Sequence, residues 1–273
     1  MPITADYHLH SHHSGDSEAS MEQMIQAAIQ KGLTHICFTE HNDFDYPALK
    51  EEEKDLFLLN TDSYLYELLG MRAKFEDQIH IGFGIELGLQ KECVRKNLIF
   101  ARGYEYDFII ASSHVANGLD PYYGKFFEGR PIKEANQEFF VSILENLKLM
   151  HNFDVCGHLD YVARYSPEKG KDYNYLDYMD VFDEIFKFLI ENEKGIECNT
   201  GGYRAGLDMT NPHFGLIKRY RELGGELITI GSDAHTPEFV GDHFAQAEEF
   251  LKEAGFKYYS IYENRLPEYK KLV

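Results

Sequence analysis

The residues nearest the amino terminus that could do chemistry are in the stretch Asp6-Tyr7-His8-Leu9-His10. Side chains alternate between the two faces of a β-strand, so in an extended stretch His8 and His10 point the same way and can share one metal ion. Asp6 lies on that face too, where its carboxylate can accept the second ring N–H of a ligating histidine and hold the tautomer. An isolated His-x-His pair is equally consistent with a solvent-facing pair on an edge strand, so the rest of the chain must decide.

Elements able to position such residues recur along nearly the whole chain. Short runs rich in β-branched and aromatic residues predict strands at Ile3–His10, Thr34–Glu40, Ile79–Leu87, Asp107–Ser113, Phe153–His158, Gly195–Thr200 and Leu227–Ser232. Better helix formers predict helices at Ser20–Lys31, Thr61–Glu76, Ile132–His151, Tyr175–Glu193 and Asn211–Leu223. This alternation indicates parallel strands with right-handed crossovers. A last apolar run, Lys257–Tyr262, would either add an eighth strand or close the barrel.

Composition limits the class of function. A chain of 273 residues with 44% hydrophobic content can bury a full core, and no linker divides it, so we expect one α/β domain over residues 1–273. A net charge of −19 argues against a nucleic-acid backbone or an anionic membrane as the partner. We find neither a leader-like amino terminus nor a run of ~18 apolar residues, and we expect a soluble, cytoplasmic protein. The four cysteines are predicted to be reduced core residues.

Two predicted connections are unusually long, Asn42–Asn60 and Val115–Pro131. Strand-to-helix loops surround the catalytic face of an α/β barrel, so long ones are candidate substrate walls or lids. Ordinary surface insertions are the alternative.

Polar residues able to bind metal or substrate stand at the end of every predicted strand. They are His8 and His10, Glu40 with His41, Glu86, His114, His158, Glu197, and Asp233 with His235. The carboxyl ends of parallel strands face one spot, so these residues should converge. Six of the 13 histidines lie at strand ends beside acids, which is hard to reconcile with scattered structural histidines.

The chemistry of such a set is metal-dependent hydrolysis. Mixed imidazole and carboxylate ligation suits Zn²⁺, Fe²⁺ or Mn²⁺, and the lack of cysteine ligands argues against a purely structural zinc site. Divalent ions lower the pKa of bound water toward ~7, and a pair of them can clamp the attacking and leaving oxygens of an in-line displacement. We expect phosphomonoester hydrolysis with a metal-bridging hydroxide as nucleophile and no covalent intermediate. Neither a nucleophile elbow nor a Walker-type loop competes with this interpretation.

Taken in order, the segments D-Y-H-L-H-S-H, F-T-E-H, G-I-E, S-S-H, G-H-L-D and G-S-D-A-H resemble the motifs of the polymerase and histidinol phosphatase (PHP) family, and in particular its histidinol-phosphatase branch. The resemblance extends from Asp6 to His235, and order, spacing and residue type all agree. It implies a single-domain, distorted (β/α)7 TIM-like barrel with a trinuclear metal centre.

The resemblance also implies a set of ligands for each of the three divalent ions. The first ion would be bound by His8, His10, Glu86 and Asp233, and Glu86 would bridge to a second ion bound also by His114 and His158. The third would be bound by Asp16, His41 and His235, with Asp6 and Glu18 as alternatives to Asp16. We assign ordinary loop, surface or helix roles to the other histidines, including His12 and His13. Simple counting gives this centre a charge of about +3, so an acidic protein can still hold a phosphate.

Substrate groups should come from the same end of the barrel. Arg164 and Arg204 each follow a predicted strand and could pair with phosphate oxygens in bidentate fashion, or form ordinary surface ion pairs. Asp160 and Glu197 are candidates for positioning a ligand or for binding a substrate amine. Either a metal-bound water or a carboxylate such as Asp160 would protonate the leaving group.

The resemblance implies hydrolysis of L-histidinol phosphate to L-histidinol and phosphate in histidine biosynthesis. Within the enzyme class, the alternative is a PHP phosphoesterase that acts on a nucleotide, a sugar phosphate or an oligonucleotide end. Outside it, the alternative is a metal-binding accessory protein without turnover. The gap-free ligand set favours an enzyme. Neither the identity of the metals nor the oligomeric state can be read from the residues.

Overall fold

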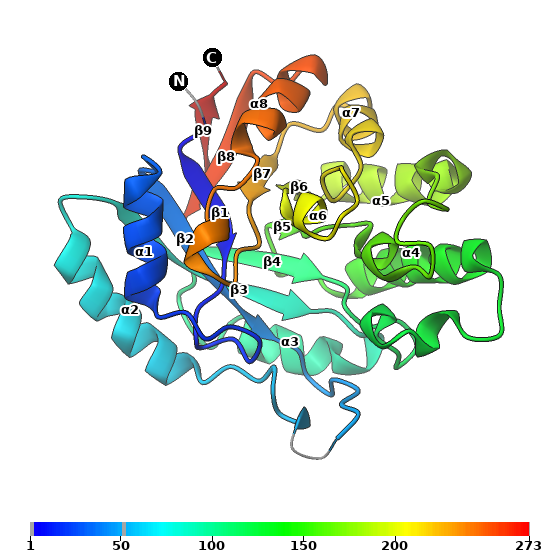
Figure 1. The fold of residues 1–273 in the computed structure, drawn as a ribbon, viewed down its shortest axis with the longest axis horizontal. Coiled ribbons are helices and arrows are strands. Elements are labelled where there is room, and N and C mark those ends of the chain that lie inside the picture. The colour runs from blue at the N-terminus through cyan, green and yellow to red at the C-terminus, as the bar shows by residue number, and fades with distance from the viewer. Residues whose placement is uncertain (1–2, 51–52, 273) are drawn as a thin grey trace.

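Seven parallel strands form a nearly closed barrel (Figure 1). The computed structural model describes residues 3–50 and 53–272. The strands follow one another in chain order in a single sheet: β1 (Ala5–Leu9), β2 (His35–Asn42), β3 (His80–Gly88), β4 (Phe108–Ser112), β5 (Val155–Cys156), β6 (Gly195–Asn199) and β7 (Ile228–Gly231). All seven predicted strands are present, and the predicted (β/α)7 TIM-like architecture is confirmed.

The gap between the first and last strands is closed by backbone hydrogen bonds just beyond β7. The His10 amide donates to the carbonyl of Ala234 at 3.0 Å, and the Asp233 amide donates to the carbonyl of His8 at 2.9 Å. These bonds hold two candidate ligand segments, from opposite ends of the chain, against each other.

Helices cover the outside of the sheet (Figure 1). They are α1 (Met21–Gln30), α2 (Thr61–Phe75), α3 (Val94–Phe100), α4 (Ile132–Leu149), α5 (Met179–Glu191), α6 (Gly201–Arg204), α7 (Phe214–Glu222) and α8 (Phe244–Glu253). The five predicted helices are confirmed within a few residues, except that a 3₁₀ turn replaces the start of the fourth and the fifth begins at Phe214. Ser20 caps α1 in a reciprocal capping box with Gln23.

Three helices were not predicted, and each has a local reason. The helices α3 and α6 are short and lack a side-chain N-cap, so their sequence signal is weak. The helix α8 has a regular apolar stripe, but it begins after His243, whose left-handed φ of 56° is not a usual helix start.

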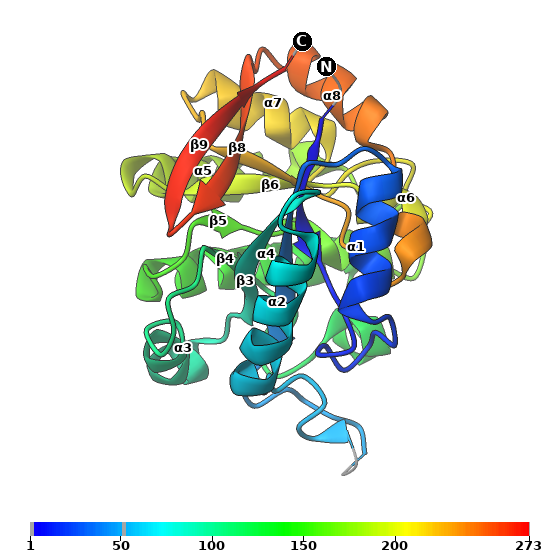
Figure 2. The same cartoon turned by 90° about the vertical axis from the view of Figure 1, so that its left-hand side faces the viewer.

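The run Lys257–Tyr262 does not add an eighth barrel strand. It forms β8 (Tyr258–Glu263), which pairs antiparallel with β9 (Leu266–Lys271) in a separate hairpin (Figure 2). The Tyr7 hydroxyl donates to the carbonyl of Tyr262 at 3.0 Å, and the Tyr262 ring packs on Phe108. These contacts lie toward the amino ends of β1 and β4, so the hairpin closes the end of the barrel opposite the candidate ligands.

The surroundings of the cysteines agree with the prediction from the sequence. All four cysteines are buried and free, as predicted for reduced core residues. Within the described residues, none of the helices combines the length and the apolar character needed to cross a membrane.

Asp6 fastens the first strand to the segments after β7. Its carboxylate accepts the amide N–H groups of Ser232 and Gly241, both at 2.9 Å, and is fully buried. The prediction that Asp6 orients a histidine ring is therefore wrong, because both of its oxygens are engaged by backbone. Burial raises the pKa of Asp6 to about 6.

Replacing Asp6 with alanine should destabilise the fold, because two buried N–H groups lose their acceptor. We expect the free energy of unfolding to fall by about 2–6 kcal/mol, at ~1–3 kcal/mol for each unsatisfied group. Urea unfolding at a fixed metal concentration measures the change. Asp77→Ala, at an exposed turn, is the control. A loss no larger than that of the control would contradict the role of Asp6.

Candidate metal centre

The nine predicted ligands converge at the carboxyl end of the barrel, as expected for parallel strands. They come from six different strand ends and from the loop between β1 and α1, which carries Asp16: His8, His10, Asp16, His41, Glu86, His114, His158, Asp233 and His235. Most of them are buried, whereas Asp16 and His235 are partly exposed.

Glu86, on β3, lies at the middle of the set and faces five imidazoles. Its Oε2 atom is 2.9 Å from His41 Nδ1 and 3.2 Å from His8 Nε2. The same oxygen is 3.6 Å from His10 Nε2. Its Oε1 atom is 2.9 Å from His158 Nε2 and 3.2 Å from His114 Nε2. This is the arrangement expected of a carboxylate that bridges two ions.

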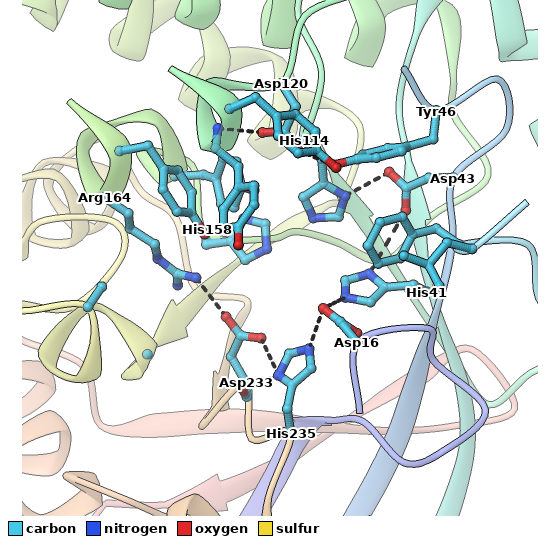
Figure 3. Close-up of a pocket in the computed structure, with 18 of the residues that line it drawn as sticks. Asp16, His41, Asp43, Tyr46, His114, Asp120, His158, Arg164, Asp233 and His235 are labelled. Carbon is cyan, nitrogen blue, oxygen red and sulfur yellow. Dashed lines mark hydrogen bonds and ion pairs between the residues drawn. The ribbon is translucent and has the colours of Figure 1, made fainter. Parts of the chain in front are cut away.

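A third group forms beside this carboxylate. Asp16 Oδ2 lies 3.1 Å from His235 Nε2 and 3.6 Å from His41 Nε2, and Figure 3 shows these three side chains pointing toward one another. Of the alternatives to Asp16, Asp6 is engaged elsewhere, and it is Asp16 rather than Glu18 that pairs with His41 and His235 among the described residues. The His10 ring packs against the rings of both His41 and His235, with centroids 4.2 Å from each, and the centroids of those two rings are 5.7 Å apart.

Each of three histidines donates a hydrogen bond from its Nδ1 atom, which points away from the metal centre, and this bond sets the tautomer of the ring. The Nδ1–H of His8 donates to Glu197 at 2.6 Å, and that of His114 donates to Asp43 at 2.8 Å. His235 Nδ1 donates to the carbonyl of Asp233 at 3.0 Å. With the proton on Nδ1, the Nε2 lone pair of each ring faces the centre, which is the form that binds metal.

His10 is oriented in the same way through a serine. The Ser14 hydroxyl donates to Glu40, so its oxygen accepts the His10 Nδ1–H at 3.0 Å. Burial, together with the neighbouring His235 and His41, lowers the pKa of His10 well below its usual value, so this ring is neutral.

Several atoms that face the centre have no hydrogen-bond partner in the protein. They include His8 Nε2, His10 Nε2, His41 Nδ1, Glu86 Oε2 and His235 Nε2, all buried. Leaving such groups unsatisfied costs about 1–3 kcal/mol each, so a protein rarely keeps several together. Four groups of three side chains here have their ligand atoms within 4.8 Å of one another: His8, His10 and Asp233; His8, Glu86 and His158; His41, Glu86 and His114; and His10, His41 and His235. The donor set therefore fits divalent metal ions.

The acids attract positive charge to the centre. Burial alone would lower the pKa of His114, but Asp43 and Glu86 outweigh it and raise that pKa well above the usual value. Burial alone would likewise raise the pKa of Glu86, but the surrounding histidines lower it strongly. Ionised carboxylates are what metal binding requires, and metal ions supply the positive charge without protonating the ring nitrogens.

Sequence reasoning found Glu197 as a candidate positioning residue but missed Asp43. Glu197 accepts the His8 ring proton and also the His158 backbone amide at 3.0 Å. Asp43 follows His41 by two residues, so its acid type and place at a strand end were a usable signal.

Both predicted arginines lie at the cavity beside the centre, and the protein holds each one in place. Arg164 donates to Asp233 Oδ2 at 2.9 Å and to Asn199 Oδ1 at 2.9 Å. Its third bond goes to Asn211, 2.7 Å away. Arg204 donates to the carbonyl oxygens of Ser232, at 3.1 Å, and Asp233, at 2.5 Å. A guanidinium has five N–H groups, so both arginines keep donors for a ligand.

Asp160 does not face the cavity. Its two oxygens accept the Asn211 side-chain amide at 2.5 Å and the His213 backbone amide at 2.8 Å. The structure therefore gives no support to Asp160 as the acid for the leaving group. It fixes Asn211, which in turn holds Arg164.

A cavity of about 700 Å³ opens onto the metal centre (Figure 3). Both long connections line it: the first contributes Tyr46 and Phe57, and the second contributes Asp120 and Tyr122. Residues 51 and 52 of the first connection lie outside the described residues. The Tyr46 hydroxyl donates to Asp120 at 2.5 Å and so joins the two loops across the cavity mouth. The loops are walls of the cavity, as one of the two interpretations predicted.

Comparison with known proteins identifies the family. The family model of the PHP domain matches residues 6–201 of this chain. The chain belongs to the PHP family. Histidinol-phosphatase from Lactococcus lactis is 35% identical over 254 residues, which cover 92% of this chain and 91% of the relative. A probable histidinol-phosphatase from Clostridium acetobutylicum is 32% identical over 97% of this chain and 98% of the relative.

Solved structures of this PHP branch share the fold. The crystal structure of histidinol phosphate phosphatase from Lactococcus lactis, complexed with zinc, L-histidinol and phosphate, has a TM-score of 0.88 and 31% identity, and the match covers 97% of this chain and 98% of that one. A structure of the putative histidinol phosphatase from Listeria monocytogenes, at 17% identity and a TM-score of 0.76, shares the fold, with coverage of 89% of this chain and 99% of that one.

Glu197→Gln should weaken metal binding, because the amide cannot orient the His8 ring as the carboxylate does. Loss of such a partner typically costs 10–100-fold in metal affinity. Metal content measured during competition with a graded chelator tests this, with folding followed by circular dichroism. Glu226→Gln, at an exposed site, is the matched control. Metal affinity equal to that of the control would contradict the role of Glu197.

Proposed function

We propose that this protein is a metal-dependent phosphomonoesterase that hydrolyses L-histidinol phosphate to L-histidinol and phosphate in histidine biosynthesis. The observation that carries the proposal is the convergence of six histidines and three carboxylates at one end of the barrel, beside a cavity lined by two arginines. The relatives support the choice of substrate, since the histidinol-phosphatase from Lactococcus lactis is 35% identical over nearly the whole chain.

Three divalent ions, Zn²⁺, Fe²⁺ or Mn²⁺, would be held as follows. His8, His10, Glu86 and Asp233 would bind the first, Glu86, His114 and His158 the second, and Asp16, His41 and His235 the third. When bound, such ions lower the pKa of a coordinated water to supply a hydroxide nucleophile and neutralise phosphate charge. The unpaired lone pairs directed at the centre support this assignment.

The arginines would orient the phosphate. Arg164 and Arg204 line the same cavity, and their existing bonds to the protein leave them little rotational freedom to lose when a ligand binds. Pre-organised guanidinium groups suit the planar, bidentate recognition of phosphate oxygens. Asp233 connects the two functions, because its side chain accepts from Arg164 and its carbonyl accepts from Arg204.

The cavity suits a small cationic leaving group. Asp120 and Glu53 contribute carboxyl groups to its lining, and Tyr46, Tyr122 and Phe57 supply aromatic surface. L-Histidinol carries an ammonium group and an imidazole, which carboxylates and aromatic faces bind well. A nucleotide base or an oligonucleotide end offers no comparable cation, and the net charge of −19 disfavours polynucleotides.

We also propose that residues 1–273 act as one PHP-type phosphoesterase domain, and that it works in the cytoplasm on a small phosphorylated substrate. Support for the single unit comes from the contacts between the ends of the barrel, where Asp6 binds the segment after β7.

Phosphate release from L-histidinol phosphate tests the activity, beside p-nitrophenyl phosphate, AMP and a short oligonucleotide. We expect fast turnover of histidinol phosphate, far slower turnover of the others, and loss of activity in a strong chelator, because the metals activate the water. Preference for another ester would retain the site and reject the substrate. Absence of turnover after reloading with Mn²⁺, Zn²⁺ or Fe²⁺ would favour a metal-binding accessory protein.

Arg204→Met should lower kcat/KM by roughly 10–100-fold, which corresponds to the loss of one charged hydrogen bond of ~1.5–3 kcal/mol. Steady-state kinetics with metal content held equal measures the change. Arg95→Met, at an exposed position on α3, is the control. Kinetics that match this control would show that Arg204 serves only to hold the backbone after β7.

A further inference from the structure

A second group of metal-binding residue types lies outside the cavity. His12 and His13 are consecutive in the loop between β1 and α1, and Glu67 projects from α2. The loop and this helix are neighbours in the fold (Figure 1). From the sequence, both histidines were assigned ordinary loop roles. Instead, their ring nitrogens and the Glu67 carboxylate oxygen all lie within 4.8 Å of one another.

The distances in this group are close to those between ligands of one zinc ion. Glu67 Oε2 lies 3.0 Å from His13 Nε2 and 3.3 Å from His12 Nε2. Zinc binds nitrogen and oxygen at ~2.0–2.2 Å, so ligand atoms around a tetrahedral ion are roughly 3.3–3.5 Å apart. Small adjustments of the three side chains would therefore admit the ion.

The position of the group gives an ion access and a firm base. The His13 side chain is only 8% exposed and packs on the Tyr64 ring, with centroids 5.6 Å apart. The His12 side chain is 42% exposed and the Glu67 side chain 28%. The same carboxylate oxygen faces both rings, so the three ligand atoms point at one shared position. The open side leaves room for a water as the fourth ligand.

We propose that His12, His13 and Glu67 form a zinc site separate from the metal centre. The bound ion would join the loop between β1 and α1 to α2. That loop also carries Ser14, which orients His10, and Asp16, which contacts His41 and His235. The zinc ion at His12, His13 and Glu67 would therefore hold in place the loop between β1 and α1, which contributes to the third metal position. The proposal does not rest on the substrate or on turnover.

Zinc binding by variants of His12 and Glu67 tests the proposed site. Protein whose metal centre has first been saturated is dialysed against a series of buffered free Zn²⁺ concentrations, and the zinc bound per chain is measured by mass spectrometry. We expect the wild type to bind one zinc per chain more than His12→Gln or Glu67→Gln, and added zinc to raise its Tm more than theirs. Because His12 is exposed, its variant should fold normally and keep its tightly bound metals.

His80→Gln is the matched control. His35 and His80 form another pair of rings, with centroids 5.5 Å apart, at the opposite end of the strands. This control should bind as much zinc as the wild type. Equal zinc in the wild type and His12→Gln at every concentration would overturn the proposal. So would loss of the extra zinc in His80→Gln, since that result indicates general binding by surface histidines.

Discussion

The ionised carboxylate of Glu86 is the interaction on which the rest of the site depends. It is fully buried at the end of β3 and faces imidazoles from four other strand ends, and four of these rings lie within 3.2 Å of one oxygen or the other. Burying such a charge is costly unless opposite charge surrounds it. Metal ions satisfy this requirement, whereas protonated rings would lose the lone pairs that face Glu86. The centre is thus a set of groups that cannot satisfy one another without cations.

This unfavourable concentration of polar groups lies above an aromatic core, and a hairpin closes the other end of the barrel. Tyr7, Phe108 and Tyr262 pack together where the β8–β9 hairpin covers the strands. Folding stability and ligand binding therefore depend on different parts of the barrel. Stability comes from the core and the outer helices, and binding comes from the carboxyl end, where the ligands are.

Positioning residues connect these two parts. Glu197, Asp43 and Ser14 each accept a ring N–H from a different histidine and thereby select the tautomer that faces the centre. Two of these partners are themselves fixed, Ser14 by Glu40 and Glu197 by the His158 amide. The orientation of the ligands is therefore a property of the folded barrel, and it precedes the arrival of metal or substrate.

The sequence by itself determined the architecture and the chemical types at the site. Short β-branched and aromatic runs that alternate with helix formers predicted the seven parallel strands. The polar residue at each strand end predicted which side chains would meet, because the carboxyl ends of parallel strands face one point. Only the tertiary structure decided which distant residues contact the segments that carry the ligands. Asp6 and Glu197 were both candidates to hold a ring, and the choice depended on backbone N–H groups of Ser232 and Gly241, remote in sequence, that engage Asp6. The pairing of His12 and His13 with Glu67 was equally hidden, since it depends on how α2 packs beside a loop, and no local pattern encodes the packing of distant segments.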